Sequence, residues 1–459
     1  MSCTKIRNIT MDKKRRELIL NGDMRKVIIK LALPLMLSNL IQTIYNITDT
    51  YFVSGLGDTE VAAIGFVWNL VFLVISLGLG LSVAGRSMIS QYVGAHDEES
   101  ARQAEGQILS FMSVLGLGFS IIFYILAPYI LKLMGADGNL YEYALTYMRI
   151  IMLGMPFTYL YFAFNSIKNA RGDMVIPMII SAVSVVINII LDPICIFDWG
   201  FGWGVAGAAI ATTFSRSIIA VGVIILISLG KLGVKLKLKD LIFHKETIKK
   251  ILSIGLPASF GQATAAIGFT IMTVMVKSFG ELTLTAYVIG SRINGIVLMP
   301  LMGIGWAFTT IAGQNLGAGK IDRVKLGYRW SIIYSMIFAL IGGVFMATLA
   351  PNIIGIFTKS QVVIEQGTFF LYIITLALPL MGIFQSLIGL YQGTGHTKFS
   401  SFMMIGRLWI LRIPMILIMK NFTNFEERSV WYAIILSNVV ICTVGIIGYF
   451  HGFWKKKTV

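Results

Sequence analysis

Four polar side chains recur along one otherwise apolar stretch near the start of the chain. Within the run from about Val27 to Val53, the spacings are three, four and three residues between Asn39, Gln42, Asn46 and Asp49. These spacings place all four on one face of a helix. A run of this length crosses a bilayer, so Asp49 lies inside hydrocarbon unless that face lines a protein interior or a water-filled cavity. A carboxylate at that depth predicts a functional site.

A second carboxylate lies at a comparable depth. Of the 22 acidic residues, only Asp49 and Asp192 fall well inside apolar runs, and Asn188 precedes Asp192 by one helical turn in INIILDP. At about 1.5 Å per residue, both aspartates fall in the outer half of the membrane. Tyr147 and Thr212 lie on runs of the opposite direction and reach a similar depth. The five side chains therefore predict one polar level inside the membrane.

Two kinds of ion chemistry fit these groups, and we expect one of them to operate. The oxygens of Asp49, Asn188, Asp192 and Thr212 suit a hard cation such as sodium, with backbone carbonyls completing its shell. Alternatively, two nearby carboxylates in a low dielectric share a proton and release it when the site opens to water. A structural reading also stands, in which each group merely bonds neighbouring helices together. Beyond a possible sodium ion, we expect no metal and no cofactor.

The composition identifies an integral membrane protein. Hydrophobic residues make up 56% of the 459 residues and charged residues 13%, which leaves too little polar surface for a soluble domain of this size. Apolar runs of about twenty residues or more predict spanning helices instead of barrel strands. The net charge of +16 raises the possibility of nucleic-acid binding, but the basic residues lie between apolar runs. We therefore expect a lipid bilayer as the main partner and no nucleic acid.

Twelve apolar runs can be counted, and the loops between them alternate between basic and nearly neutral. By the positive-inside rule both termini lie in the cytoplasm of a multi-pass protein of the cell inner membrane, which we expect to be a monomer. The predicted divisions are a basic cytoplasmic N-terminal segment (1–26), a first lobe (27–229), a basic cytoplasmic linker (230–250), a second lobe (251–454) and a cytoplasmic C-terminus (455–459).

The chain also contains an internal repeat. A constant offset of 223 residues relates Pro34 to Pro257, Gly57 to Gly280, Gln91 to Gln314, Gly94 to Gly317, Pro156 to Pro379 and Gly172 to Gly395. Such a repeat predicts an all-α protein of twelve transmembrane helices in two pseudo-symmetric six-helix lobes, related by an axis along the membrane normal.

The repeat does not extend to the buried acids. At the same offset Asp49 corresponds to Met272 and Asp192 to Met415. We therefore expect ion coupling in the first lobe. Pro34 interrupts the first run, where a proline removes a backbone hydrogen bond; we assign it as a hinge, with a merely tolerated kink as the alternative.

The remaining polar groups of the runs suggest a cavity and give no sign of an enzyme. We assign Asn39, Gln42, Asn46 and, in the eleventh run, Arg412 to the lining of a substrate cavity. None of the four histidines lies deep in a run, and the chain has no GxxxxGK[ST] phosphate-binding pattern. The 23 methionines suggest adaptable apolar walls for varied organic ligands.

Together these segments resemble the multidrug and toxic compound extrusion (MATE) family. The resemblance rests on ALPLMLSNLIQTIYNITDTYFVSGLG, QYVGA, YMRIIMLGMPF, NIILDPICIF and GWGVAGAAIATT. It implies an antiporter that exports organic, often cationic or amphipathic, compounds in exchange for protons or sodium ions by alternating access. The DinF-like branch is the closer one, and its first-lobe site carries over onto Asp49, Asn188, Asp192 and Thr212, and onto Tyr147. The NorM-like branch adds acids in the second lobe that this sequence lacks. A lipid-linked oligosaccharide flippase of the same superfamily is the alternative.

Overall fold

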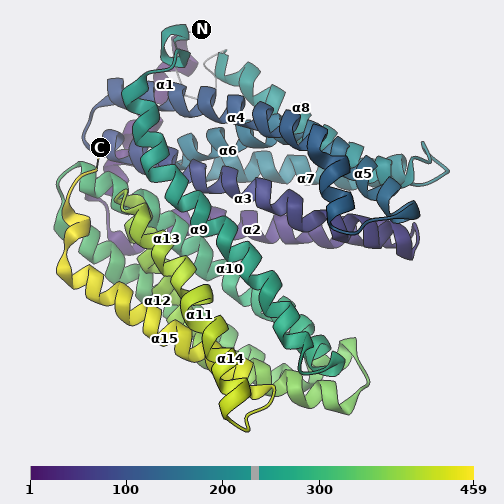
Figure 1. Ribbon diagram of the computed structural model, residues 1–459. Coiled ribbons are helices and arrows are strands. Elements are labelled where there is room, and N and C mark those ends of the chain that lie inside the picture. Colours follow the sequence, from purple (N-terminus) through teal and green to yellow (C-terminus); the bar gives the residue numbers. More distant parts are fainter. Residues whose placement is uncertain (1, 229–236, 459) are drawn as a thin grey trace. The chain divides into compact units, whose positions relative to one another are not determined.

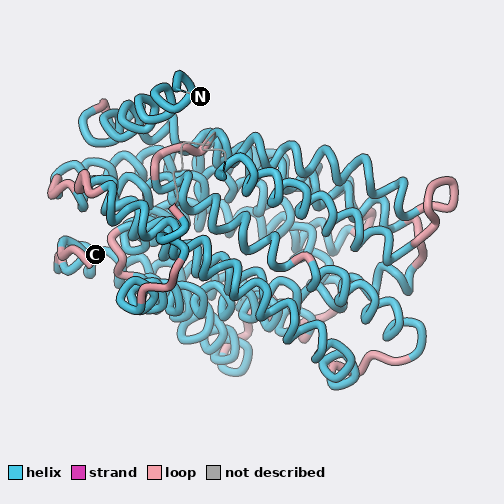
Figure 2. The backbone as a smooth tube through the Cα atoms, turned by 90° about the horizontal axis from the view of Figure 1, so that it is seen from above, coloured by secondary structure: helices cyan, strands magenta, loops and turns pink. Residues whose placement is uncertain are grey.

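The computed structural model describes residues 2–228 and 237–458, and in these ranges the chain is helical with no strand. Figure 2 shows the helices joined by short loops. The prediction of an all-α protein is therefore confirmed.

Eleven helices of the described chain are long and apolar enough to cross a membrane by themselves. A twelfth span is formed by α5 (Gly138–Leu153) and α6 (Met155–Ala170), which meet at a bend of 44°. The bend falls at Gly154 and Pro156, where the proline lies in the first turn of α6 and has no N–H to donate to the end of α5. The predicted count of twelve spans is reached with this pair taken as one.

Contacts divide the chain into two compact units. Unit 1 consists of Met1–Glu17 and Leu37–Ser259, and unit 2 of Leu18–Met36 and Phe260–Val459. Three helices therefore contribute to both units: α1 (Ser2–Asn21), α2 (Met24–Ser54) and α9 (Lys245–Lys277). In α2 and α9 the division falls just after Pro34 and Pro257. The first part of α2 therefore belongs to unit 2 and the first part of α9 to unit 1, so the contact units differ from the sequence halves in these two segments.

The rest of unit 1 is a bundle of apolar helices that run side by side (Figure 1). Besides α5 and α6, its helices are α3 (Asp58–Gly94), α4 (Glu98–Leu133), α7 (Val175–Ile196) and α8 (Gly204–Ser228).

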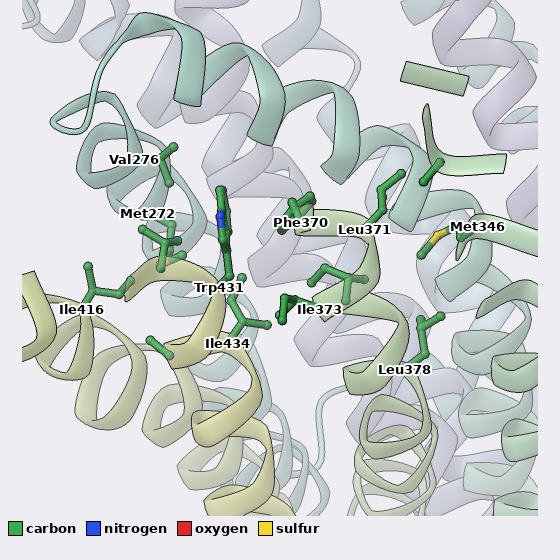
Figure 3. Close-up of a cluster of buried hydrophobic side chains, with 14 of the residues drawn as sticks. Met272, Val276, Met346, Phe370, Leu371, Ile373, Leu378, Ile416, Trp431 and Ile434 are labelled. Carbon is green, nitrogen blue, oxygen red and sulfur yellow. The ribbon is translucent and has the colours of Figure 1, made fainter. Parts of the chain in front are cut away.

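Unit 2 packs its helices around an apolar core. Its helices are α10 (Glu281–Gly317), α11 (Ile321–Phe357), α12 (Gln361–Gly393), α13 (Thr397–Ile405), the π-helical segment η2 (Gly406–Arg412), α14 (Ile413–Phe422), α15 (Arg428–His451) and the short η3 (Phe453–Lys455). Figure 3 shows Trp431, Phe370, Ile416 and Met272 within this core. Burial of such side chains contributes about 1.5–3 kcal/mol each where the alternative is water.

The end of the linker is fastened to α4. The predicted linker, 230–250, lies partly outside the described residues; its later part contains η1 (Leu238–Leu241). Asp240 accepts a hydrogen bond from Arg102 at 2.9 Å, and the Gln107 amide donates to the Asp240 carbonyl at 2.8 Å. The described part of the linker is therefore docked on unit 1.

Buried charges cluster near the same end of α4. Arg171 pairs with the fully buried Glu105 and with Glu98. Burial by itself lowers the pKa of Arg171, but the two carboxylates outweigh it and raise that pKa above its usual value. Arg16 of α1 also pairs with Glu98, at 2.9 Å, so this network holds the first part of α1 on unit 1.

Candidate functional site

The two polar residues of α7 form the centre of the site. The Asn188 side-chain amide donates to Asp192 Oδ1 at 3.0 Å, and the two residues are 1% and 0% exposed. The other oxygens, Asn188 Oδ1 and Asp192 Oδ2, are buried with no hydrogen-bond partner in the described chain. Unsatisfied buried acceptors are costly, and two of them side by side are suited to a cation or an acidic proton.

A hydroxyl pair joins α2 to α8 at the same site. The Tyr45 hydroxyl and Thr212 Oγ1 lie 3.1 Å apart, and both residues are buried. Tyr147 of α5 is also buried, and its phenol interacts electrostatically with Tyr45 and Asp49. The prediction from sequence included Thr212 and Tyr147 but missed Tyr45. The spacing could have indicated Tyr45, because this residue precedes Asp49 by four residues, or one helical turn.

Asp49 completes the acidic part of the site. Its carboxylate is half-buried and interacts electrostatically with Asp192 on α7. A cation, Arg216 of α8, interacts with Asp49 as well as with Tyr45 and Tyr147. Arg216 was not predicted, although an arginine in the interior of an apolar run, four residues after Thr212, is itself a signal of function. The site therefore combines two carboxylates with a fixed positive charge.

Small residues and an apolar cluster position these groups. At Gly207, an added Cβ would lie 2.2 Å from the Cys195 carbonyl oxygen, so α8 approaches α7 more closely than any larger side chain allows. Just beyond Asp49 and Asp192 along their helices, Val53, Ile196 and Ala208 pack together and join α2, α7 and α8. The GWGVAGAAIATT segment thus contributes packing as well as Thr212.

The four predicted cavity residues differ in burial and in the unit to which they belong. Asn39 is half-buried, whereas Gln42 and Asn46 are exposed in the structure of the chain and hydrogen-bond to each other at 3.4 Å. Arg412 belongs to unit 2, and the other three belong to unit 1. Their shared role in a cavity, like the hinge at Pro34 inside α2, stays a prediction.

Unit 2 has no acidic pair at the corresponding positions. Met272 is fully buried in the apolar core of unit 2 shown in Figure 3, and Met415 packs against that core. The two halves of the sequence therefore share a helical scaffold, but the acidic pair belongs to the first half alone.

Comparison with known proteins agrees with this architecture. The family model named MatE matches residues 34–194 and 257–418, one segment in each sequence half. The chain belongs to the MATE family. The two matched segments begin at Pro34 and Pro257, so the repeat read from the sequence is also the repeat of the MATE family.

Curated MATE relatives match almost from end to end. The chain is 29% identical over 438 residues to the "Probable multidrug resistance protein YoeA" of Bacillus subtilis (strain 168), covering 93% of each protein. It is 27% identical over 432 residues to the "Multidrug export protein MepA" of Staphylococcus aureus (strain N315), covering 92% of this chain and 93% of that protein. Among solved structures, one described as the outward-facing conformation of a multidrug resistance MATE family transporter superposes with a TM-score of 0.89 at 27% identity, covering 94% of this chain and 97% of that one.

Proposed function

We propose that this chain is a secondary active multidrug efflux antiporter. It exports organic compounds, often cationic or amphipathic, in exchange for an inward flow of protons or sodium ions by alternating access. The curated relatives, named for multidrug resistance or export and matched over nine-tenths of their length, favour this function over a lipid-linked oligosaccharide flippase. We expect no enzymatic activity and no cofactor beyond the coupling ion.

One observation carries the assignment of the coupling site. Asp192 is completely buried, one of its oxygens lacks a donor among residues 2–228 and 237–458, and the neighbouring Asn188 oxygen lacks one too. A bound cation or a proton on the carboxyl group would satisfy this need, and its loss would restore the cost of a buried unpaired carboxylate and of empty acceptors. The energy of the site therefore depends on whether the ion is present.

Both coupling ions remain compatible with the donor set. Sodium would take oxygens from Asp49, Asn188, Asp192 and Thr212, the ligand type that hard cations prefer. A proton would be shared between the two aspartates, which interact electrostatically across α2 and α7. Arg216 offsets part of the negative charge when the site is empty. Tyr45 holds Thr212 in place in either case.

The membrane arrangement belongs to the same proposal. Both termini lie in the cytoplasm of a monomer in the cell inner membrane, and the first lobe carries the DinF-like type of site. Substrate enters a cavity that Asn39, Gln42, Asn46 and Arg412 help to line, and Pro34 in α2 serves as a hinge, since an interior proline weakens the backbone hydrogen bonding of a helix.

Transport by the reconstituted protein tests the function. Purified protein in liposomes is given a fluorescent cationic dye, and proton and sodium gradients are imposed separately at matched membrane potential. Dye movement against its own gradient under one of the two ion gradients is expected. If neither gradient moves any dye or drug substrate in protein that binds it, the antiport function is refuted.

A further inference from the structure

Two arginines lie deep in unit 2, on the span that contains η2. Arg407 and Arg412 are 7% and 5% exposed. Arg412 Nε donates to Ser437 Oγ at 3.0 Å, and its Nη2 donates to Asn438 Oδ1 at 3.1 Å. Both partners are neutral, so they solvate the guanidinium but leave its charge uncompensated.

Arg407 has even weaker partners. Its Nη1 donates to the thioether sulfur of Met381 at 3.0 Å, and its guanidinium lies 4.4 Å from the centre of the Phe384 ring. Its Nε is buried and has no acceptor in the part of the chain that the structure describes. An arginine normally uses its five N–H donors on carboxylates or phosphates, so this environment leaves much of its capacity unused.

The π-helical segment brings these two charges together. In an α-helix, residues five apart point about 140° away from each other. In a π-helix the hydrogen bonds run between residues five apart, so such residues lie one above the other. The Ile413 N–H donates to the Leu408 carbonyl in this way, and the charges of Arg407 and Arg412 interact with each other. The rare backbone geometry therefore aligns two like charges that an α-helix would separate.

No acid of unit 2 neutralises them. Neither guanidinium has a carboxylate within 4.0 Å in residues 2–228 and 237–458. The acidic residues of unit 2 lie in loops or within the first five residues of a helix: Asp23, Glu281, Asp322, Glu365, Glu426 and Glu427. Leu408, between the two arginines, is part of the apolar core. Two permanent charges in such surroundings are costly unless a counter-charge joins them.

We propose that Arg407 and Arg412 form an anion-binding site in unit 2. The ligand is either a free inorganic anion of chloride size or the carboxylate of an organic substrate, since both supply the acceptor that Arg407 Nε lacks. Such an anion would lie between the two guanidinium groups.

The repeat-related position in the first half of the sequence has no arginine. At the 223-residue offset, Arg412 corresponds to Ile189, the residue after Asn188, in the continuous α-helix α7. The same span thus carries acceptors for a cation in the first half of the sequence and donors for an anion in the second. The proposal stands apart from the coupling function, because it concerns equilibrium binding in unit 2.

Thermal unfolding of the full chain in lipid nanodiscs tests the site without transport. At constant ionic strength, potassium chloride replaces potassium isethionate, a salt without a carboxylate, in one arm, and potassium benzoate replaces it in the other. A ligand that binds only the folded state raises Tm in proportion to ln(1 + [L]/Kd), so the shift starts near Kd and reaches a few degrees at about 100 times Kd. A logarithmic rise of Tm with chloride identifies a free inorganic anion, and such a rise with benzoate alone identifies a carboxylate ligand.

Variants assign the effect to the two arginines. In Arg407→Gln and Arg412→Gln, the apparent Kd should rise at least about tenfold, as expected for loss of a charge-assisted hydrogen bond. Arg407→Lys and Arg412→Lys keep the charge and the fold but lose the planar fork, so binding should weaken less. Arg329→Gln, an exposed arginine of unit 2, and Asp49→Asn in unit 1 should leave it unchanged.

Two results would overturn the proposal. One is that neither chloride nor benzoate raises the Tm of the parental protein above its value at the same ionic strength in the reference salt. The other is equal stabilisation in the parental protein and in the arginine variants; should the glutamine variants fail to fold, the lysine variants decide this. Unchanged anion binding in Asp49→Asn, with transport lost, would separate this site from the coupling site.

Discussion

Asn188 donates its side-chain amide to Asp192 Oδ1 over 3.0 Å, one helical turn apart on α7 and almost completely shielded from solvent. This bond fixes the orientation of the carboxylate and leaves Oδ2 directed at no donor in the described chain. A bound ion therefore meets an oxygen whose position is already set, which reduces the ordering cost of binding.

Replacing Asn188 should disable coupling before it disables folding. Asn188→Leu removes the donor to Asp192, at a cost of about 1–3 kcal/mol for a buried acceptor left unsatisfied. Gradient-driven dye efflux from vesicles should fall to the background, while the amount of folded protein in the membrane stays measurable. The matched control is Leu411→Met at the repeat position of Asn188, which should export normally. Equal efflux in the two variants would contradict this role.

Tyr45 and Thr212 should behave as a coupled pair. Their hydroxyls lie 3.1 Å apart, so Tyr45→Phe and Thr212→Val each break the same hydrogen bond. In a double-mutant cycle on Tm or on transport, the coupling energy should be about 0.5–1.5 kcal/mol. Additive effects would show that the two residues act separately. Thr213→Val, which affects a bond to the Ile150 carbonyl instead, is the control.

Arg216 should be required for its charge. Its interaction with Asp49 lowers the cost of holding that carboxylate in the membrane. Arg216→Gln should lose most gradient-driven export, and Arg216→Lys should keep part of it, because lysine retains the charge but not the planar geometry. Export rate normalised to protein amount gives the comparison. Parental export by the glutamine variant would rule out an electrostatic role.

Gly80 should be among the least replaceable small residues of unit 1. A Cβ there would lie 2.2 Å from the backbone of Ser259 in α9, whereas at the repeat position Gly303 the closest atom is Met36 Cγ, at 2.8 Å. Gly80→Ala should lower Tm more than Gly303→Ala, because backbone cannot move aside as a flexible side chain can. Gly118→Ala, with open space around it, should be neutral or stabilise by up to about 1 kcal/mol. The reverse order would contradict the close approach of α3 and α9.

The scaffold could be predicted from the sequence because its apolar runs and its repeat are visible in the order of the residues alone. Apolar runs predict helices, and the constant offset between Pro34 and Pro257 predicts the repeat. The pairing of Asn188 with Asp192 was also accessible, since residues four apart on a helix share a face. The span that bends at Pro156 differs from its repeat partner, because Pro379 lies inside the continuous helix α12.

Features that depend on packing between helices were not accessible in the same way. Helical spacing places Tyr45 and Arg216 on faces of their own helices, but not opposite each other or Asp49. Likewise, the change to π-helical hydrogen bonding that aligns Arg407 with Arg412 has no periodicity signal in seven residues. The positions of Tyr45 and Arg216 depend on contacts between distant parts of the sequence, whereas the π-helical bond from Ile413 to Leu408 is local but is visible only in the structure.

Gradient-driven transport by the Asp49→Asn, Asp192→Asn double variant is the most direct test of coupling in the first half of the chain. Asparagine keeps the size and removes the charge, so the protein should fold and bind substrate in liposomes yet fail to move it under an imposed proton or sodium gradient. The control is Met272→Leu with Met415→Leu, at the repeat positions, for which a packing cost under about 1.5 kcal/mol and parental transport are expected. Transport by the double aspartate variant at the parental rate, under either gradient, would contradict the account.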